Sequence, residues 1–486
     1  MSRNGGTEGF CLMKITPIIG LEIHVELKTK SKMFCGCDAH HFHVAANTHT
    51  CPVCLGLPGA LPVPNLTACE WCIKLGLALG CSINEETFFE RKNYFYPDLA
   101  KGYQITQLQK PFAINGKIDI DGQQIRINRA HMEEDTGKSI HQNGSTLLDF
   151  NRSGVPLVEI VSEPDISSPA LAKKYLLKIQ QLVRYLEISD ADIEKGSMRC
   201  EPTVNLCIDD KFYTPLVEIK NVASLTGVMT AIEYEIDRQT KQFATDHQEK
   251  ANPAKGGSAS GGKTTRGWDA DKNQTFLQRE KEGSADYRYF PEPDIPPITF
   301  TSKQIAEIKK SLPELPDAKI AKYKALNLSE YDANLLAEDS LFSAAFEKAL
   351  NNSNSPEFAK FTANLFIGPL KTITIDPQKI NPDFFKNLFD NKNNLSSTAI
   401  KQLVLDSYQT DTDPLILAKS QNLFQVSDTS TLEKIAQKVI ADNPKAVADY
   451  QKNPASIGFL IGQLMKESKG SANPQVAKEI LETLLN

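Results

Sequence analysis

Two closely spaced cysteine pairs near the N-terminus constrain the fold of this chain more than any other sequence feature. The first pair is Cys35 and Cys37, and the second, separated from it by thirteen residues, is Cys51 and Cys54. Two pairs at this separation can fold into one tetrahedral thiolate site for Zn²⁺. Four thiolates fill the coordination shell, so we expect a structural Zn²⁺ that fixes a loop and performs no chemistry.

Two other interpretations of these cysteines stay open. A redox-active Cys-x-x-Cys motif is disfavoured because no βαβ pattern of the thioredoxin kind surrounds it, and unligated thiols are the third interpretation. Histidines of the same segment are alternative ligands, namely His40, His41, His43 and His49. The other cysteines show no framework spacing, and we expect reduced thiols packed as small apolar groups at Cys11, Cys69, Cys72, Cys81, Cys200 and Cys207.

The overall composition is typical of a globular protein in a reducing compartment. Hydrophobic residues make up 41% of the 486 residues, and no apolar run is long enough for a membrane span. The first residues lack the apolar segment of a signal peptide, so we expect a cytoplasmic protein without a membrane partner. The net charge of −6 excludes a chain that binds nucleic acid through its overall field. Any contact with RNA must therefore be local, or shared with a partner.

The pattern of apolar and polar residues differs between regions of the chain, which predicts an α+β protein. After an N-terminal extension (1–14), residues 15–300 contain many short alternating runs and are expected to form a domain rich in antiparallel sheet. Residues 301–415 have a helical pattern, and residues 416–486 are expected to form a compact C-terminal helical module. Its helices should begin at the Asn-Pro pairs 443–444, 453–454 and 473–474, where Asn caps and Pro fits the first turn.

Two further local patterns in the sheet-rich region are informative. Ser168 and Pro169 predict the start of a helix whose apolar residues recur at helical spacing from Leu171 to Leu186. Residues 251–263, ANPAKGGSASGGK, contain nothing to bury and predict a flexible surface loop.

The segment IIGLEIHVEL at 18–27 alternates strictly between apolar and polar residues, which predicts a strand. Glu22, His24 and Glu26 then share one face, with about 6.5–7 Å between same-face neighbours. All three side chains are proton carriers or ligands for a Mg²⁺-type cation, which favours a functional face over an exposed polar edge.

Other acidic and basic segments carry weaker signals. Glu133, Glu134 and Asp135 lead into a turn with Gly137 and Lys138, although acidic turns of this kind are common. Residues 90–107 mix Arg91, Lys92 and Lys101 with aromatics, a pattern that suits a nucleotide or an RNA end, or equally a packed hairpin. The pentapeptide PLVEI occurs at 156–160 and 215–219, and it predicts either two strands that present Glu159 and Glu218 to one site or a chance match.

No nucleophile elbow, dinucleotide fingerprint, kinase signature or Walker motif is present in the sequence. The residues alone therefore indicate a zinc-stapled α+β protein with a carboxylate-rich site for a metal and an anion, and a helical accessory module.

Taken together, several motifs resemble one family. They are GLEIHVEL, CPVCLGLPGALPVPN, RKNYFYPDLAKGYQI, EEDTGK, GVPLVEIVSEPD, GSMRCEPTVNL, VEIKNVAS, RGWD, DYRYFPEPDIPP and NPASIGFLIGQLMKESKGSANPQ. In this order they are similar to GatB, the B-subunit family of the aspartyl/glutamyl-tRNA(Asn/Gln) amidotransferases. The resemblance covers about residues 15–484. It implies a catalytic cradle domain, a helical domain and a tRNA-binding tail.

The resemblance also implies a reaction and partners. Such a protein works with an amidase partner (GatA) and a further small partner (GatC) on mischarged Glu-tRNA(Gln) or Asp-tRNA(Asn). With ATP and Mg²⁺ it phosphorylates the side-chain carboxylate, and ammonia then displaces the phosphate. A runner-up interpretation is a non-catalytic, zinc-stapled module that only positions charged tRNA; clustered acids near phosphates argue against it.

The family resemblance assigns roles to individual residues. The metal and ammonia-facing site would contain Glu22, His24, Glu134 and Glu159, the first three as Mg²⁺ ligands. Contacts to the phosphate or the acyl end are expected at Lys92, Lys138 and Arg199. Zn²⁺ would be held by Cys35, Cys37, Cys51 and Cys54.

The chain departs from the family pattern at two places. The family usually has an acidic residue just before Thr265-Arg266-Gly267-Trp268-Asp269, whereas this chain has Lys263-Thr264 there, so a role for an acid is in doubt. The tail, residues 416–486, has eight lysines, no arginine and seven acidic residues, a net charge of +1. Its expected tRNA contact must then depend on a few lysines, for which Lys466 and Lys469 are candidates, and on shape.

Overall fold

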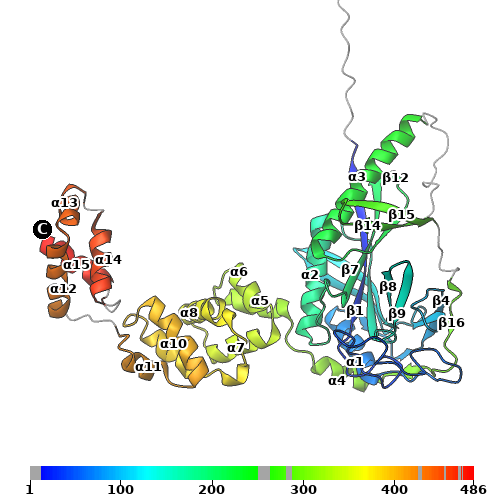
Figure 1. The fold of residues 1–486 in the computed structure, drawn as a ribbon, viewed down its shortest axis with the longest axis horizontal. Coiled ribbons are helices and arrows are strands. Elements are labelled where there is room, and N and C mark those ends of the chain that lie inside the picture. Colours follow the sequence, from blue (N-terminus) through cyan, green and yellow to red (C-terminus); the bar gives the residue numbers. More distant parts are fainter. Residues whose placement is uncertain are drawn as a thin grey trace, which may run out of the picture. The chain divides into compact units, whose positions relative to one another are not determined.

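The computed structural model describes residues 13–249, 263–280, 287–424, 429–453, 456–468, 472 and 474–485. The chain divides into two compact units, Met1–Leu315 and Pro316–Asn486, which Figure 1 shows as ribbons. The division falls after helix α4 (Ser302–Lys310), because α4 packs against α1 (Leu66–Ala78) of the first unit. The domain boundaries expected from the sequence stay predictions. The loop expected at 251–263 lies, except for Lys263, outside the described residues.

The first unit is built on one ten-stranded sheet. Its strand order is β15 (Gln274–Glu280), β14 (Thr264–Asp269), β13 (Val217–Lys220), β11 (Met198–Ile208), β1 (Ile15–Glu26), β10 (Pro156–Ser162), β7 (Gln123–Glu134), β6 (Ala113–Ile120) and β2 (Ser82–Ile83), with β12 (Phe212–Tyr213) on β11. Only β13 and β14 are parallel neighbours among these pairs. The α+β class with a sheet rich in antiparallel strands is therefore confirmed.

Strand β1 lies at the centre of this sheet because its sequence alternates. Ile19, Leu21, Ile23 and Val25 are almost completely buried on one face. They form one hydrophobic core with side chains of α1 and of α2 (Pro169–Tyr185). Figure 1 shows α2 and α3 (Leu225–Glu249) along one side of the sheet. Each such side chain contributes about 1.5–3 kcal/mol on burial, so a one-residue slip of register is strongly disfavoured. The polar residues of β1 are thereby fixed on the opposite face.

The helix predicted after Ser168 is confirmed as α2. The Ser168 side chain accepts a hydrogen bond from the Leu171 amide, and Pro169 occupies the first turn. The described cysteines outside the two pairs are buried and free, as expected, at Cys69, Cys72, Cys81, Cys200 and Cys207. Cys11 lies outside the described residues.

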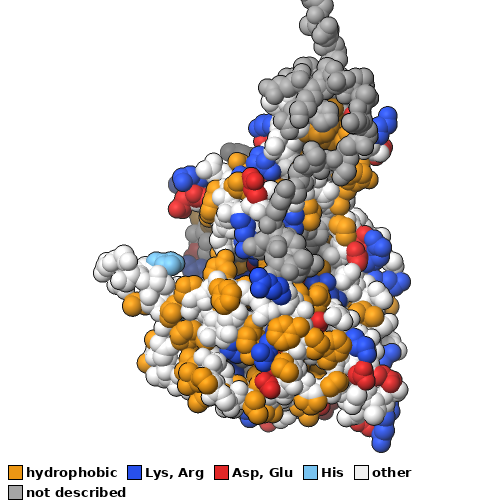
Figure 2. Space-filling view, turned by 90° about the vertical axis from the view of Figure 1, so that its right-hand side faces the viewer, with side chains coloured by type: hydrophobic (Ala, Val, Ile, Leu, Met, Phe, Trp, Pro, Cys, Tyr) orange, Lys and Arg blue, Asp and Glu red, His pale blue; other side chains and the backbone are white. Residues whose placement is uncertain are grey.

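The first unit also contains smaller sheets. They are β16 (Phe290–Pro291), β4 (Glu90–Asn93) and β5 (Tyr103–Thr106); β17 (Ile298–Thr299) with β3 (Glu86–Thr87); and the hairpin β8 (Lys138–Gln142) with β9 (Ser145–Asp149). On the face shown in Figure 2, hydrophobic side chains are grouped over the lower part.

The second unit is helical and contains two cores. The first core is formed within α5 (Pro316–Ala325), α6 (Glu330–Leu336), α7 (Ser340–Leu350), α8 (Pro356–Ile367), η2 (Pro369–Thr372), η3 (Pro377–Lys379), α9 (Pro382–Asp390), α10 (Ser397–Thr410) and α11 (Pro414–Ser420). The second core joins α12 (Thr429–Asp442), α13 (Pro444–Lys452), α14 (Ile457–Glu467) and α15 (Pro474–Leu485). The expected starts at Pro444 and Pro474 are confirmed, whereas Pro454 lies outside the described residues and α14 begins at Ile457. The expected cap is wrong at Asn443, whose side chain donates to the Val439 carbonyl instead.

Among the described residues, no helix combines the length and the apolar character needed to span a membrane.

Candidate active site

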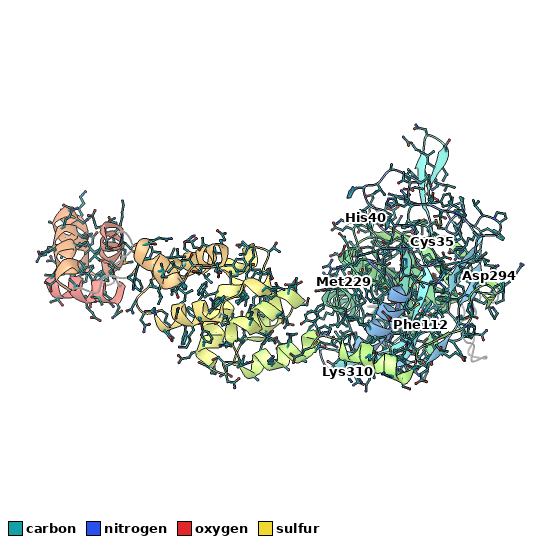
Figure 3. All side chains as sticks on the ribbon, turned by 90° about the horizontal axis from the view of Figure 1, so that it is seen from below. Cys35, His40, Phe112, Met229, Asp294 and Lys310 are labelled. Carbon is teal, nitrogen blue, oxygen red and sulfur yellow. The ribbon has the colours of Figure 1, made fainter. Side chains whose placement is uncertain are left out.

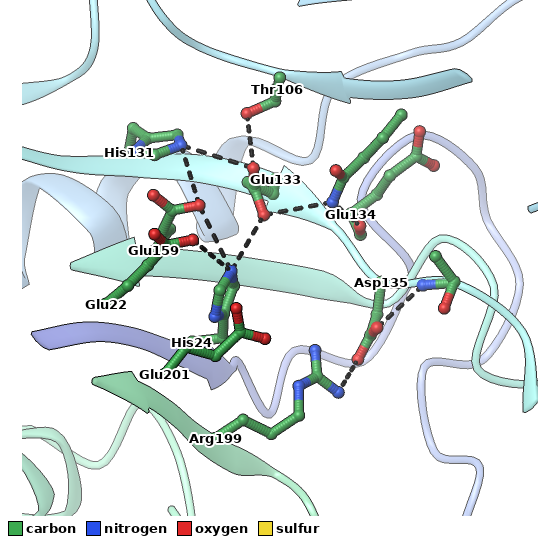
Figure 4. A network of polar contacts seen from close by, with 12 residues as sticks. Glu22, His24, Thr106, His131, Glu133, Glu134, Asp135, Glu159, Arg199 and Glu201 are labelled. Carbon is green, nitrogen blue, oxygen red and sulfur yellow. Dashed lines mark hydrogen bonds and ion pairs between the residues drawn. The ribbon is translucent and has the colours of Figure 1, made fainter. Parts of the chain in front are cut away.

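Three neighbouring strands bring acidic and imidazole side chains together on the polar face of the sheet. In the register of β1 and β10, His24 lies opposite Glu159, and in that of β10 and β7, Glu159 lies opposite His131. Glu22 and Glu133 follow two positions away on β1 and β7, on the same faces as the two histidines. Figure 4 shows these five side chains converging, and we call Glu22, His24, His131, Glu133 and Glu159 the acid–imidazole cluster.

The distances within the cluster are those of a site for a cation. His24 Nε2 lies 3.3 Å from Glu159 Oε2, 3.7 Å from Glu133 Oε2 and 3.8 Å from Glu22 Oε1. His131 Nε2 lies 3.5 Å from Glu133 Oε1 and 3.7 Å from Glu159 Oε2. Two triads with ligand atoms within 4.8 Å of one another therefore share Glu159. Carboxylates with imidazole suit a hard or borderline divalent ion.

Burial and mutual charge perturb the titration of the cluster. Burial and the nearby Glu159 raise the pKa of Glu22 to about 7. Burial favours neutral His24, yet its hydrogen bond to Glu159 and the surrounding carboxylates raise its pKa to about 9. Burial also opposes ionisation of Glu159, but His131 and His24 hold its pKa well below the ordinary value. Excess negative charge is thus confined in a buried place, which a bound cation would relieve.

Both imidazoles leave one nitrogen without a partner. The Nδ1 atoms of His24 and His131 are buried and form no hydrogen bond. Their Nε2 atoms face the carboxylates of the cluster. This orientation directs one nitrogen of each ring toward the centre, and it fits the donor set of a metal site.

Glu133 is held in place from strand β5. The Thr106 hydroxyl donates to Glu133 Oε1 at 2.8 Å, and the Gln104 amide donates to Oε2 at 3.2 Å. Burial and Glu159 oppose its ionisation, but the hydrogen bond from His131 and the charge of Lys92 keep its pKa below the ordinary value. Its carboxylate is therefore both ionised and fixed in orientation.

A cavity of about 250 Å³ opens over the cluster, and its walls combine both signs of charge. Basic residues that line it are Lys92, Arg129, Lys220, Lys263 and Arg279, and aromatic ones are Tyr287 and Tyr289. Burial disfavours the Lys92 cation, yet Glu133, Tyr289 and Glu159 raise its pKa well above the ordinary value. The cavity can therefore hold a cation next to an anionic ligand.

The second PLVEI strand also faces this cavity. Glu218 on β13 lines it and lies 2.9 Å from Lys220 Nζ and 2.5 Å from Lys263 Nζ. Glu201 on β11 pairs with the same Lys220 at 2.6 Å. The repeated pentapeptide thus presents a glutamate to the cavity from each strand. Lys263, next to the position at which the family pattern has an acidic residue, is part of its basic wall.

The structure does not place Glu134 in the cluster. Successive residues of β7 point to opposite faces, so Glu134 points away from Glu133, as Figure 4 shows. Its carboxylate forms a buried ion pair with Lys101 and accepts a hydrogen bond from the Ile105 amide at 3.0 Å. The acidic residue of this motif that reaches the cluster is Glu133.

Of the three expected substrate contacts, only Lys92 lines the cavity. Arg199 points to a separate buried network, where its guanidinium lies 2.8 Å from Asp135 Oδ2 and 3.9 Å from Glu26 Oε1. Lys138 is exposed at the start of the β8–β9 hairpin. Glu26 is likewise not part of the cluster. Its Oε2 atom lies 3.0 Å from His41 Nε2 instead.

Sequence reasoning did not assign a site role to His131, Glu133, Arg129 or Lys220. A signal for the first two was present, because His131-x-Glu133 repeats the Glu22-x-His24 alternation on another strand. Nothing local indicated Arg129 and Lys220, which reach the cavity only through strand order.

The four cysteines of the two pairs converge in the loop between β1 and α1, which Figure 3 marks with Cys35 and His40. The sulfur atoms lie within 4.8 Å of one another, and those of Cys51 and Cys54 are 3.9 Å apart. Tetrahedral ligation at a Zn–S distance of about 2.3 Å requires sulfur atoms about 3.8 Å apart, so these residues fit the ion. A hydrogen bond with Cys35 lowers the pKa of Cys54 to about 5, with a further contribution from Lys32.

Lys32 compensates charge beside the cysteines. It is fully buried, and its ammonium donates to the carbonyls of His49, at 2.7 Å, and Phe150, at 3.3 Å. Four thiolates around Zn²⁺ would carry a net charge of −2, so a buried cation at this place is favourable.

The two expected tRNA contacts lie in the tail. Lys466 is in the last turn of α14. Lys469 lies outside the described residues.

Comparisons with known proteins agree with this geometry. Residues 17–306 match the GatB/GatE catalytic domain, and residues 344–485 match the GatB domain. The B subunit of the aspartyl/glutamyl-tRNA(Asn/Gln) amidotransferase of Persephonella marina is 43% identical over 97% of this chain and 100% of the relative. The B subunits from Thermosipho melanesiensis (41% identity; 97% and 100%) and Dehalococcoides mccartyi (43%; 98% and 99%) are similar over the same extent. The chain therefore belongs to the GatB family of amidotransferase B subunits.

Proposed function

We propose that this chain is the B subunit of an ATP-dependent amidotransferase that converts Glu-tRNA(Gln) to Gln-tRNA(Gln), Asp-tRNA(Asn) to Asn-tRNA(Asn), or both. The observation that carries the proposal is the acid–imidazole cluster facing basic residues across one cavity. A module that only positions RNA needs basic groups for phosphates and has no use for three converging carboxylates.

The chemistry requires an activated carboxylate. An oxygen of the substrate carboxylate attacks the terminal phosphorus of ATP, the bond to the bridging oxygen breaks, and ADP leaves. Ammonia then attacks the acyl carbon, phosphate leaves with the bonding electrons, and the nitrogen loses a proton to give the amide. Such phosphoryl transfer depends on positioning and on charge stabilisation rather than on a protein nucleophile.

The proposed role of each residue depends on where it lies in or beside the cavity. Glu22, His24 and Glu159, together with His131 and Glu133, would hold Mg²⁺, which when bound neutralises charge on the phosphate oxygens. Lys92, and with it Lys220, faces this cluster and would bind the phosphoryl oxygens or the acyl end. The roles first expected for Glu134, Lys138 and Arg199 at the metal or phosphate lack support, because none of the three lines the cavity.

The cysteine site and the tail complete the proposal. Cys35, Cys37, Cys51 and Cys54 would bind structural Zn²⁺, and Lys466 with Lys469 would contact tRNA. The proposed partners are a glutamine-hydrolysing amidase (GatA) and a small third protein (GatC), because the related chains are named as one subunit of an amidotransferase.

The test measures two separate properties of the reconstituted complex, amidation and tRNA binding. The double variant Glu22→Ala, His24→Ala should lose ammonium-dependent amidation by at least about 100-fold, the scale at which a lost charge-stabilising group acts. Its affinity for mischarged tRNA should be unchanged. Glu194→Gln, at an exposed position, is the matched control and should keep full activity. Normal amidation by the double variant would exclude the proposed roles of Glu22 and His24.

A further inference from the structure

One basic residue of the cavity, Arg129, makes few contacts for a guanidinium that lies among buried carboxylates. Its Nη2 atom lies 3.5 Å from Glu159 Oε1, and its Nη1 atom donates to Asn128 Oδ1 at 3.3 Å. Its Nε atom is buried and forms no hydrogen bond within the part of the chain that the structure describes. Arg91 shows the contrast, because its guanidinium donates to Glu292 in two bonds of 2.6 Å and 2.9 Å. The donors of Arg129 are therefore largely available to a ligand.

A bulge in β7 directs Arg129 toward the cavity. Ile127 is buried in the hydrophobic core, and the next core residue along the strand is Ala130, three positions later instead of two. The pairing of β7 with β10 shifts its register at the same place, between Arg129 and Ile127. The extra residue reverses the alternation, so Arg129, His131 and Glu133 all line the cavity. Bulges beside active sites commonly re-aim a side chain in this way.

Two other cations of the cavity wall are already engaged by carboxylates. Lys220 Nζ lies 2.9 Å from one oxygen of Glu218, and Lys263 Nζ lies 2.5 Å from the other. Lys220 also lies 2.6 Å from Glu201. Arg129 lines the same cavity with 26% of its side chain exposed, so a ligand can reach a cation there without breaking a close ion pair.

An anionic substrate group needs a cation of its own in this cavity. The glutamates that line the cavity are Glu22, Glu133, Glu159 and Glu218, and they repel an entering carboxylate. In the proposed function Mg²⁺ and Lys92 neutralise the phosphate oxygens, which leaves the carboxylate of the aminoacyl group to be compensated. A guanidinium matches a carboxylate in two parallel hydrogen bonds, a geometry that a lysine cannot provide.

The position of Arg129 places such a carboxylate next to the proposed metal site. Glu159 joins the two, since its Oε1 atom faces Arg129 and its Oε2 atom lies 3.3 Å from His24 Nε2. We propose that Arg129 binds the side-chain carboxylate of the aminoacyl group, an inference that rests on the function proposed above. In this role Arg129 forms no covalent bond and transfers no proton. It holds the carboxylate beside the terminal phosphate, and it distinguishes the acid from the amide product, which carries no charge.

The experiment compares variants of the reconstituted complex. Arg129→Lys keeps the charge but loses the planar fork, and Arg129→Gln removes both. Arg126→Gln is the control, because Arg126 lies on the same strand, is 64% exposed and does not line the cavity. Circular dichroism and the melting temperature establish which variants are folded.

Two readouts separate the carboxylate from the phosphates. The first is the Kd, without ATP, for one tRNA charged either with the acidic amino acid or with its amide. The ratio of these two constants isolates recognition of the carboxylate from recognition of the RNA. The second is ammonium-dependent amidation, which gives KM for ATP and for the mischarged tRNA.

The wild type and Arg126→Gln should bind the acid-charged tRNA at least about tenfold more tightly than the amide-charged tRNA, the scale of a charge-assisted hydrogen bond. Arg129→Gln should bring this ratio close to one by weakening only the acid-charged complex, and Arg129→Lys should retain part of the ratio. KM for ATP should be unchanged in both. If Arg129→Gln is unfolded, the reduced ratio is read from Arg129→Lys.

A wild-type ratio near one, or a ratio that the Arg129 variants leave unchanged, overturns the proposal. A raised KM for ATP with an unchanged ratio also overturns it and would identify a nucleotide phosphate as the ligand of Arg129. Failure of the wild-type complex to form the amide with ATP and ammonium would instead refute the proposed function.

Discussion

At the scale of single residues, Glu133 and Glu134 are adjacent in sequence but differ in environment. Glu133 points into the acid–imidazole cluster, where Thr106 and Gln104 fix its carboxylate. Glu134 points to the opposite face and neutralises the buried Lys101. In the proposed function one carboxylate serves the chemistry and the other stabilises the fold, so exchanging either for an amide should have distinguishable effects.

The variant Glu133→Gln should lower kcat for ammonium-dependent amidation by about 10- to 100-fold, the usual effect of weakening a metal site, and should leave the melting temperature nearly unchanged. The variant Glu134→Gln leaves Lys101 charged and buried, which should cost about 3–5 kcal/mol in the free energy of unfolding. Steady-state kinetics and urea unfolding measure the two quantities. The reverse pattern, with Glu134→Gln inactive but fully stable, would show that our assignment of the two residues is wrong.

The free energy of unfolding at acidic pH should depend on the ionisation of Glu218. Burial raises the pKa of this carboxyl, but Lys220 and Lys263 lower it to about 2, below its ordinary value of 4.5. A depressed folded-state pKa stabilises the protein above about pH 4.5, and this contribution is lost as the pH falls toward 2. Glu218→Gln should therefore cost up to about 3 kcal/mol at pH 7 and progressively less below pH 4.5.

Urea unfolding of the wild type and of Glu218→Gln at pH 7, 4.5 and 3 measures this difference. Glu194→Gln is the control at an exposed position and should show no difference at any of these pH values. A difference for Glu218→Gln that stays constant from pH 7 to pH 3 would contradict the proposed ion pairs.

At the scale of elements, the cysteine loop is connected to the strand that carries Glu159. The Met33 amide donates to the Gly154 carbonyl at 2.7 Å, and the Ser153 hydroxyl donates to the Cys54 carbonyl at 2.9 Å. Residues 153 and 154 lead directly into β10. A metal that fixes the loop would therefore also fix the start of β10, without touching the substrate.

Cys51→Ser should reduce bound zinc from one equivalent to nearly none and should lower the melting temperature, because structural zinc contributes about 10 kcal/mol or more to its local fold. His43→Asn is a matched variant in the same loop, since asparagine tolerates the positive φ of 60° at this position. It should keep full zinc, as measured by elemental analysis. Loss of zinc from His43→Asn with retention in Cys51→Ser would show that histidines, not four cysteines, bind the metal.

The strands also explain which parts of the site were predictable from sequence. Strict alternation at 18–27 was enough to place Glu22 and His24 on one polar face. The same rule applied to 129–134 would have selected His131 and Glu133, but this segment was interpreted as an acidic turn leading to Gly137, and Glu134 was assigned through the family resemblance. Contacts such as Lys101 with Glu134, or Lys220 with the cavity, depend on register and strand order, which local patterns do not contain.

At the scale of the whole molecule, chemistry and tRNA binding are expected in different units. The acid–imidazole cluster and the cysteine site both lie in the first unit, and Lys466 lies in the second. The tail has a net charge of only +1, so its tRNA contact would depend on individual lysines rather than on a general field. A change in the tail should then alter the affinity for tRNA but not the chemical step.

Lys466→Ala should raise KM for mischarged tRNA several-fold, leave kcat unchanged, and reduce the slope of log affinity against log salt by about one phosphate contact. Lys401→Ala, at an exposed position of α10, is the control and should change none of these values. Filter binding at several salt concentrations, together with initial rates, provides the measurement. An unchanged salt slope would remove Lys466 from the proposed tRNA contact.

In the proposed function, the divalent ion on which phosphoryl transfer depends is bound by Glu22, His24, His131, Glu133 and Glu159. Anomalous diffraction from crystals of the complex with Mn²⁺ and a non-hydrolysable ATP analogue tests it most directly. We predict an anomalous peak within about 2.0–2.3 Å of a Glu159 carboxylate oxygen, with the terminal phosphate toward Lys92. A fully occupied Mn²⁺–nucleotide site elsewhere, with no peak at Glu159, would show that the acid–imidazole cluster is not the metal site.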